Sequence, residues 1–221
     1  MKKDLLIIAG PSAGGKTTVA ECLMGKDSRF CLVRSVTTRA PRGDGKDEEY
    51  IYLTPEEFDK ALATGEILES MVYSGQCYGT PRSELERALA DGRIPLLILD
   101  LNGVVALTDN GEYSSCVIYV YTDLNTAEQR LYSRYLGNGP TPKGLASFVS
   151  RKERNIKDFL DLPALSPRFY SFVENMSDIE SATDGVAEAF ASYLEGVAAD
   201  HQRNLTVAEQ LARSAQEKQK L

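Results

Sequence analysis

The sequence is poor in the residues on which several kinds of catalysis and metal binding depend. It contains one histidine, His201, and no tryptophan among its 221 residues. Catalysis by paired histidines and metal sites with two histidine ligands are therefore excluded. The four cysteines are widely spaced and include no C-x-x-C pair. In a chain of this length, such cysteines are typical of buried thiols in a reducing compartment, not of a disulfide framework or a zinc site.

Long apolar runs and an excess of positive charge are also missing. The first apolar run covers only Leu5 to Ala9, whereas a membrane-spanning helix needs about 20 apolar residues. The chain has 25 basic and 32 acidic residues, a net charge of −7. Because such a chain has no general attraction to nucleic acid or to anionic membranes, any phosphate binding must be local. We predict a cytoplasmic protein with no nucleic-acid or membrane partner, and assembly into a homo-oligomer is left open.

The remaining composition is that of one globular domain, with 43% hydrophobic and 26% charged residues. Short apolar runs alternate with helix-like segments, which predicts an α/β fold with a mostly parallel sheet flanked by helices. Strands are expected over 5–9, 31–37, 66–73, 95–100, 116–121 and 169–174. Helices are expected over 17–24, 54–64, 80–92, 145–160 and 178–194, with another that Asp123 caps and that passes through Arg134. The segment 198–221 is expected to be a solvated or loosely docked helix.

A phosphate-binding motif lies between the first strand and the first helix. Gly10 to Thr17 match G-x-x-x-x-G-K-[ST]. In this context the main-chain N–H groups of the loop and the helix N-terminus bind anionic oxygens, Lys16 reaches the terminal phosphates of ATP, and the Thr17 hydroxyl is placed for Mg²⁺. Lys16 is therefore a candidate catalytic residue and Thr17 a candidate metal ligand. The residues expected to bind ATP here are Gly10, Pro11, Ser12, Ala13, Gly14, Gly15, Lys16, Thr17 and Thr18.

The same residues also satisfy a rival motif. Gly10 to Gly14 match G-x-S-x-G, the nucleophile elbow of serine hydrolases. That interpretation needs a histidine base, and the only histidine lies in the atypical C-terminal segment. It also needs upstream strands and an oxyanion loop, yet only nine residues precede Gly10. The phosphate-binding interpretation is therefore preferred.

A second cluster of basic residues suggests where a phosphate acceptor could bind. Residues 34–42 contain three arginines in an otherwise acidic protein. A solvated basic strand end is the simplest alternative. However, Arg39 and Arg42 flank a turn made rigid by Pro41, and paired arginines of this kind bind phosphate through two parallel hydrogen bonds.

Seven short motifs then occur in order along the chain, and each is weak alone. They are Gly10-Pro11-Ser12, Ser35-x-Thr37-Thr38-Arg39-x-Pro41-Arg42, Tyr50-x-Tyr52, Thr54-x-Glu56-Glu57-Phe58, Leu68-Glu69, Ser74-Gly75-x-x-Tyr78-Gly79-Thr80 and Asp100-Leu101-Asn102-Gly103. Together they closely resemble guanylate kinase over residues 4–194. The resemblance implies MgATP-dependent phosphorylation of GMP, and of dGMP, to the diphosphate.

The resemblance also implies a domain organisation and a set of site residues. The domain would cover 1–196, with a P-loop NTPase core (1–35, 83–133 and 152–196), a GMP-binding insertion (36–82), a lid (134–151) and a polar helical tail (197–221). The residues implied around the GMP phosphate are Arg39, Arg42, Tyr50 and Tyr78. Those implied around the guanine base are Ser35, Glu69, Thr80 and Asp100. A carboxylate at Glu69 suits guanine because it accepts from the paired N–H donors of that base, which adenine lacks. Tyr52 is expected to be a packing residue.

On the ATP side, the resemblance implies that Arg134 and Arg151 close over the nucleotide from either side of the loop 137–142 and stabilise charge on the transferred group. Asn175 matches an asparagine of the adenine-side loop. The sequence departs from the family pattern at Ala13, where a glycine is common, and at Ile98, which replaces the first Asp of an Asp-x-Asp strand. If Ala13 needs a positive φ, its strain is about 1 kcal/mol.

Two alternatives stay open beside guanylate kinase. One is a kinase for another nucleoside monophosphate, and the other is a non-catalytic guanylate-kinase-like binding module. The intact Gly15-Lys16-Thr17 argues against the module, because a module would not need a phosphate cradle. Glu69, Ser35 and Thr80 argue for guanine over other bases.

Overall fold

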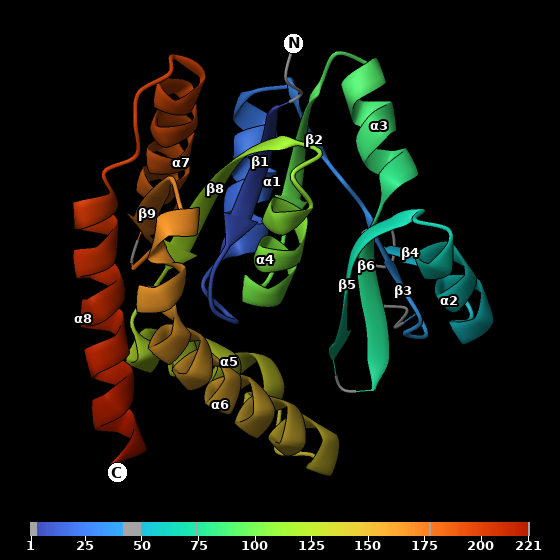
Figure 1. The fold of residues 1–221 in the computed structure, drawn as a ribbon. Helices are drawn as coiled ribbons and strands as arrows, with labels where there is room; N and C mark the ends of the chain where they lie inside the picture. The colour runs from blue at the N-terminus through green and yellow to red at the C-terminus, as the bar shows by residue number, and fades with distance from the viewer. Residues whose placement is uncertain (1–3, 42–49, 74, 177, 221) are drawn as a thin grey trace. The chain divides into compact units, whose positions relative to one another are not determined.

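The computed structural model describes residues 4–41, 50–73, 75–176 and 178–220 (Figure 1). It has a five-stranded sheet of order β2-β7-β1-β8-β9 and a four-stranded sheet of order β4-β3-β6-β5. In the first sheet, β2 pairs with β7 and β8 pairs with β9, both in parallel. The α/β fold with a mostly parallel sheet is confirmed. The chain divides into two compact units, Met1–Ile7 with Lys26–Ser115, and Ile8–Gly25 with Cys116–Leu221.

One boundary between the units falls within strand β1 (Asp4–Ala9), whose residues Leu5 to Ala9 are fully buried. The other strands of the first unit are β2 (Phe30–Leu32), β3 (Ser35–Thr37), β4 (Tyr50–Tyr52), β5 (Ile67–Tyr73), β6 (Gln76–Pro81) and β7 (Ile94–Ile98). Its helices are α2 (Pro55–Ala63), α3 (Arg82–Ala90) and α4 (Leu101–Asn110).

Two expectations for this unit were wrong, and one helix was missed. The segment 31–37 is two strands, because β2 pairs with β7 whereas β3 pairs with β4 and β6 of the other sheet. Residues 80–81 belong to β6, and α3 begins only at Arg82. Helix α4 was not foreseen, although its first turn is capped by the side chain of Asp100. Apolar patterning records burial and not the sheet that buries a residue, so it did not show where the chain changes sheet.

The start of α2 shows how local sequence sets an element in this unit. Thr54 Oγ1 accepts a hydrogen bond from Glu57 N at 3.2 Å, and Glu57 Oε2 accepts one from Thr54 N at 2.8 Å. This is the predicted capping box, which satisfies two main-chain donors at the helix start. The helix directs Phe58, 2% exposed, onto Val36 and Ile67 in a small core.

The second unit contains β8 (Ser114–Tyr121) and β9 (Ser171–Glu174) and most of the helices. These are α1 (Lys16–Lys26), α5 (Leu124–Leu136), α6 (Pro142–Leu165), the 3₁₀ helix η2 (Ser166–Arg168), α7 (Ile179–Leu194) and α8 (His201–Gln219). Helix α1 continues past Gly25, where it was expected to end. Helix α6 begins earlier than expected, because Thr141 accepts a hydrogen bond from Gly144 N and Pro142 occupies the first turn.

The C-terminal segment is a packed helix of this unit and not a loosely docked one. Helix α8 packs against α6, η2 and β9 (Figure 1). Its buried residues are Asn204, Ala208, Leu211, Ala212 and Ala215. Near its end, Lys218 and Lys152 of α6 both pair with Glu128 of α5, at 3.0 and 2.7 Å. Among the described helices, none is both long enough and apolar enough to cross a membrane.

Candidate active site

The phosphate-binding loop joins β1 to α1 in a backbone conformation that few side chains tolerate. Gly10, Ala13 and Gly15 have φ angles of 151°, 63° and 89°. A Cβ atom on Gly10 would collide with the carbonyl oxygen of Val120, and one on Gly15 would collide with the side-chain amide of Asn175. Glycine is therefore required at both positions. Ala13 has the positive φ angle for which the sequence analysis expected backbone strain.

Lys16, the first residue of α1, folds back over the loop. Its Nζ atom donates hydrogen bonds to the carbonyl oxygens of Gly10 and Pro11, both at 2.8 Å. These bonds hold the ammonium group against the loop. In P-loop proteins the lysine at this position contacts the terminal phosphates of a nucleotide. Thr17 follows it in the first helical turn and is half-buried.

Side chains from three other segments of the same unit bind the loop from outside. Asn155 of α6 accepts from Ser12 N at 2.7 Å and donates to Ser12 O at 3.0 Å. Arg130 of α5 donates to Ala13 O at 3.3 Å. Asn175, which follows β9, donates to Gly14 O at 2.9 Å. Three consecutive loop residues are each fixed by a different segment.

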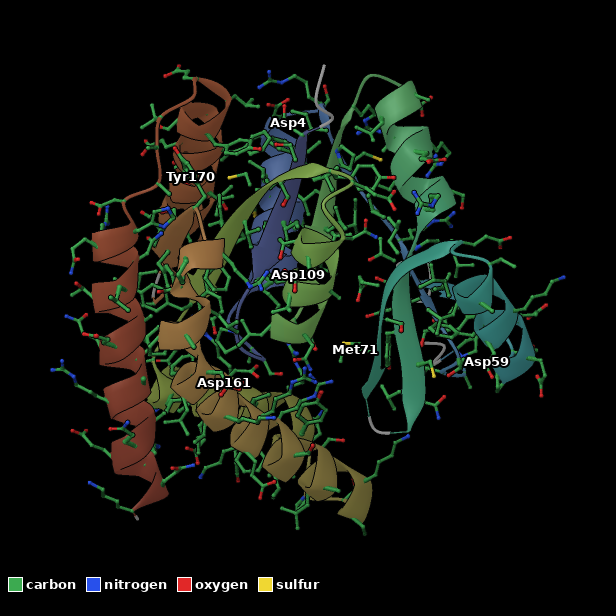
Figure 2. The ribbon with its side chains drawn as sticks, viewed as in Figure 1. Asp4, Asp59, Met71, Asp109, Asp161 and Tyr170 are labelled. Atoms are coloured by element: carbon green, nitrogen blue, oxygen red, sulfur yellow. The ribbon has the colours of Figure 1, made fainter. Side chains whose placement is uncertain are left out.

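The two arginines expected to form the lid differ in their positions. Arg151 of α6 donates from Nη1 to Ser12 Oγ at 3.3 Å, and its guanidinium lies 5.6 Å from the centre of the Tyr135 ring. Arg134 is exposed near the C-terminal end of α5. In the described part of the chain, Arg151 and Arg130 contact the loop, whereas no such contact is seen for Arg134. Figure 2 draws the side chains of the described residues as sticks, with Asp161 labelled on α6.

The residues implied around guanine lie in the first unit, on β3, β5, β6 and the start of α4. Glu69 is 6% exposed, and its Oε1 accepts a hydrogen bond from Thr80 Oγ1 at 2.7 Å. Asp100 caps α4 by accepting from Gly103 N at 2.7 Å. A Cβ atom on Gly103 would lie 3.2 Å from Glu69 Oε2 and 3.3 Å from Asp100 Oδ1. Glycine here leaves space beside both carboxylates.

The electrostatics of this pocket follow from its burial. The pKa of Glu69 is raised to about 7: burial is the main cause, the hydrogen bond from Thr80 lowers the pKa, and the nearby charge of Asp100 raises it. Asp100 thus lies beside Glu69 and serves α4. The base-pocket role implied for Asp100 stays a prediction.

The residues implied around the GMP phosphate surround Arg39 in the same unit. Its guanidinium lies 5.2 Å from the ring centre of Tyr50 and 5.9 Å from that of Tyr52, and its Nη2 donates to Tyr52 Oη at 3.3 Å. Its Nη1 is buried and, among the described residues, has no hydrogen-bond partner. Tyr78 contacts the Tyr50 ring edge-on at 6.1 Å. A buried unpaired guanidinium nitrogen is costly, so this atom points to an anionic ligand.

Two further candidates of the acceptor site, Ser35 on the base side and Arg42 on the phosphate side, have fewer described contacts. Ser35 of β3 is half-buried and lies opposite Tyr50 in the strand register. Arg42 lies outside the described residues. On β5, Met71, labelled in Figure 2, lies opposite Tyr78 of β6, and this pairing fixes the position of Tyr78 on the sheet.

Sequence reasoning missed four residues of this arrangement. Tyr52 was assigned to packing although it binds Arg39, and Gly103 was given no role although it borders Glu69. Arg130 was left unassigned, and Asn155 was not considered. The motif Asp100-Leu101-Asn102-Gly103 could have indicated Gly103. A lone asparagine in a charged helix carries no comparable signal.

The fold and these residues define a class, a P-loop protein with the glycine-rich loop in one unit and a cluster of arginine, tyrosine and carboxylate side chains in the other. A family model described as guanylate kinase matches residues 2–155. The chain belongs to the guanylate kinase family, and it is an enzyme of that family.

Individual relatives agree with this assignment. A guanylate kinase of Granulibacter bethesdensis is 33% identical over 159 residues, covering 72% of this chain and 73% of that protein. One of Mesoplasma florum is 30% identical over 189 residues, covering 85% of this chain and 60% of that protein. The crystal structure of guanylate kinase from Anaplasma phagocytophilum aligns with a TM-score of 0.57 at 24% identity, covering 87% of this chain and 86% of that one. At that identity, the structural match supports the fold.

Proposed function

We propose that this protein transfers the terminal phosphoryl group of MgATP to GMP, and to dGMP, giving ADP and the guanine nucleoside diphosphate. The observation that carries the choice of guanine is the buried carboxylate of Glu69, oriented by Thr80 at 2.7 Å. An ionised Glu69 accepts hydrogen bonds from the ring N–H and amino group of guanine. Adenine presents no such pair of donors to it.

The acceptor phosphate is bound by Arg39, Tyr50 and Tyr78, with Arg42 in the same role. Arg39 is held by Tyr52, and its buried Nη1 supplies the donor for a phosphate oxygen. Ser35 and Asp100 complete the base pocket. Because these contacts concern the base and the phosphate, the 2′-hydroxyl is not needed, and dGMP is accepted as well.

The donor nucleotide binds along residues 10–18, with Asn175 fixing Gly14. When ATP binds, Lys16 gives up its hydrogen bonds to the two loop carbonyl oxygens and donates to the terminal phosphates instead. Arg151, beside Ser12, stabilises charge that develops on the transferred group. Arg134 is assigned the same role from the far end of the proposed lid, 134–151.

The site also suits Mg²⁺. This ion keeps several waters and takes oxygen ligands from the protein and from substrate phosphates, and the Thr17 hydroxyl is the P-loop group that would supply one of them. When bound, Mg²⁺ neutralises charge on the phosphates. Ile98 ends β7 where an aspartate is usual. Asp100 caps α4 through Gly103 N, so it is not assigned to the metal. A cytoplasmic location belongs to this proposal.

A coupled assay of ADP release tests the proposal, with MgATP against GMP, dGMP, AMP, CMP and UMP. GMP should have the highest kcat/KM, with dGMP next. Preference for another base would replace guanylate kinase by the alternative monophosphate kinase. No turnover of any monophosphate, with retained GMP binding, would support the non-catalytic module.

The Glu69→Gln variant tests the base assignment directly. It places an amide donor against a guanine donor, which costs about 1–3 kcal/mol, so kcat/KM for GMP should fall at least about tenfold to a hundredfold. Use of AMP should not fall in parallel. Glu66→Gln is the matched control, because Glu66 is exposed just before β5. Unchanged GMP kinetics in folded Glu69→Gln would refute the guanine pocket.

A further inference from the structure

Asn155 is a buried polar residue that the proposed function does not use. It lies on α6, is 2% exposed, and carries no charge to bring to a substrate. Both polar atoms of its carboxamide are engaged with one residue, through Ser12 N at 2.7 Å and Ser12 O at 3.0 Å. The partners are 143 residues apart in the chain. A side chain paired in this way with the N–H and the C=O of one residue fixes both the backbone at that residue and the helix that carries the side chain.

Arg151 is four residues before Asn155 on the same helix, so the two side chains share one face. Both face Ser12, Asn155 at its main chain and Arg151 at its hydroxyl, 3.3 Å from Nη1. The length of an arginine side chain lets its guanidinium reach many positions around one backbone location. The position of α6 relative to the loop therefore decides which of these positions Arg151 occupies.

The Asn155 bond also affects the loop itself. Ser12 N donates to Asn155, and Gly14 N donates to Pro11 O at 3.1 Å. With these two amides engaged inside the protein, the phosphate cradle is left to the other amides of the loop. Asn155 thus fixes the backbone N–H and C=O of Ser12 as well as the position of α6.

We propose that Asn155 is a positioning residue for phosphoryl transfer: it anchors α6 to the phosphate-binding loop at Ser12 and so places Arg151 beside the transferred group. The inference rests on the proposed function only in that a phosphoryl group is transferred at this loop. It does not depend on which nucleoside monophosphate accepts it.

The test variant is Asn155→Leu, which keeps the side-chain volume close to that of asparagine and removes both hydrogen bonds. A misplaced catalytic group costs up to about a hundredfold in rate. We expect kcat to fall about tenfold to a hundredfold, with KM for the acceptor within about twofold, because the acceptor residues lie in the other unit. Asn155→Gln keeps a donor and an acceptor and should recover part of kcat.

Asn204→Leu is the matched control. Asn204 is 3% exposed, and its Nδ2 donates to the carbonyl oxygens of Phe169 and Tyr170 at 2.8 and 3.2 Å, away from the loop. Both leucine variants should lower the thermal unfolding midpoint by several degrees. Only Asn155→Leu should lower kcat. An equal loss of kcat in both would reduce Asn155 to a structural role and overturn the proposal.

A double-mutant cycle with Arg151→Ala gives the sharpest result. If Asn155 acts through Arg151, Asn155→Leu should change kcat by less than about twofold in the Arg151→Ala background. Additive losses would overturn the proposal. The ratio of variant kcat to wild-type kcat is measured with whichever monophosphate the wild type uses best. The identity of that monophosphate tests the proposed function separately.

If neither Asn155 variant folds, hydrogen exchange in the unmodified full chain decides. The Ser12 amide should be protected without nucleotide, and exchange at the rate of an exposed loop amide would overturn the proposal.

Discussion

At the scale of single residues, Glu69 carries the most specific chemistry, and its ionisation makes a pH dependence testable. Its pKa is raised to about 7, chiefly by burial. Guanine needs two acceptors, so GMP binds the ionised form. Affinity for GMP should therefore be complete above about pH 7 and fall as the pH drops through the pKa, by about tenfold in Kd per pH unit well below it.

Isothermal titration between pH 5.5 and 8.5, in buffers of different ionisation enthalpy, measures this effect. GMP binding at pH 6 should release about one proton from Glu69. Glu69→Gln is the control for titration of the GMP phosphate, because it keeps that contribution and lacks the carboxyl. The same pH profile in both proteins would show that Glu69 does not titrate with the ligand.

Ala13 offers a second residue-scale prediction, about stability. A non-glycine residue at its φ of 63° is strained by about 1–2 kcal/mol. Ala13→Gly removes that strain, while the added freedom of glycine in the unfolded chain costs about 0.4–1 kcal/mol. The free energy of unfolding, measured in urea, should rise by up to about 1 kcal/mol.

Gly65 supplies the opposite change as a control. Its φ is 73°, and an added Cβ would meet open space. Gly65→Ala therefore introduces backbone strain without a collision and should lower the free energy of unfolding by about 1 kcal/mol or more. Destabilisation by Ala13→Gly would mean that the alanine methyl group makes contacts worth more than the strain.

At the scale of elements, helix α8 should be needed for the stability of the second unit. Ala208 is fully buried on its packed face, whereas Gln210 is exposed. Ala208→Asp buries an unpaired charge and should lower the free energy of unfolding by about 3 kcal/mol or more. Gln210→Asp, the same new residue on the other face, should change it by less than about 0.5 kcal/mol.

Thermal and urea unfolding, followed by circular dichroism, measure both variants. Equal stability of Ala208→Asp and wild type would show that α8 does not pack in solution as described. A helix that only adds solubility could accept the charge on either face.

At the scale of the whole molecule, the proposed function assigns the donor and the acceptor nucleotide to different units. Lys16 belongs to the unit with the loop, and Glu69, Arg39 and Tyr50 belong to the other. Lys16→Ala should therefore abolish turnover while leaving the Kd for GMP within about twofold. Calorimetric titration with GMP and the coupled assay measure the two effects separately.

Lys26→Ala is the control for this experiment. Lys26 is exposed at the far end of the same helix, and its loss should leave both turnover and GMP binding unchanged. A large loss of GMP affinity in folded Lys16→Ala would contradict the division of the two nucleotides between the units.

The sequence by itself was sufficient where the physical cause is local. The loop 10–17 is one contiguous segment, and its glycines and lysine indicate phosphate binding without any residue from elsewhere in the chain. The capping box at Thr54 and Glu57 spans one helical turn and was predicted with its helix. The family could also be predicted, because the motifs between residues 34 and 103 keep their order and spacing along the chain.

The tertiary structure decided what depends on residues far apart in the chain. It brought Asn155 to Ser12 across 143 residues and Asn175 to Gly14 across 161. It also divided 31–37 between two sheets and packed α8 against α6. Hydrophobic periodicity indicates that a residue is buried. Which residue it packs against depends on the topology, because the topology sets which elements lie side by side. For that reason the loop could be read from the sequence, and the side chains that fix it could not.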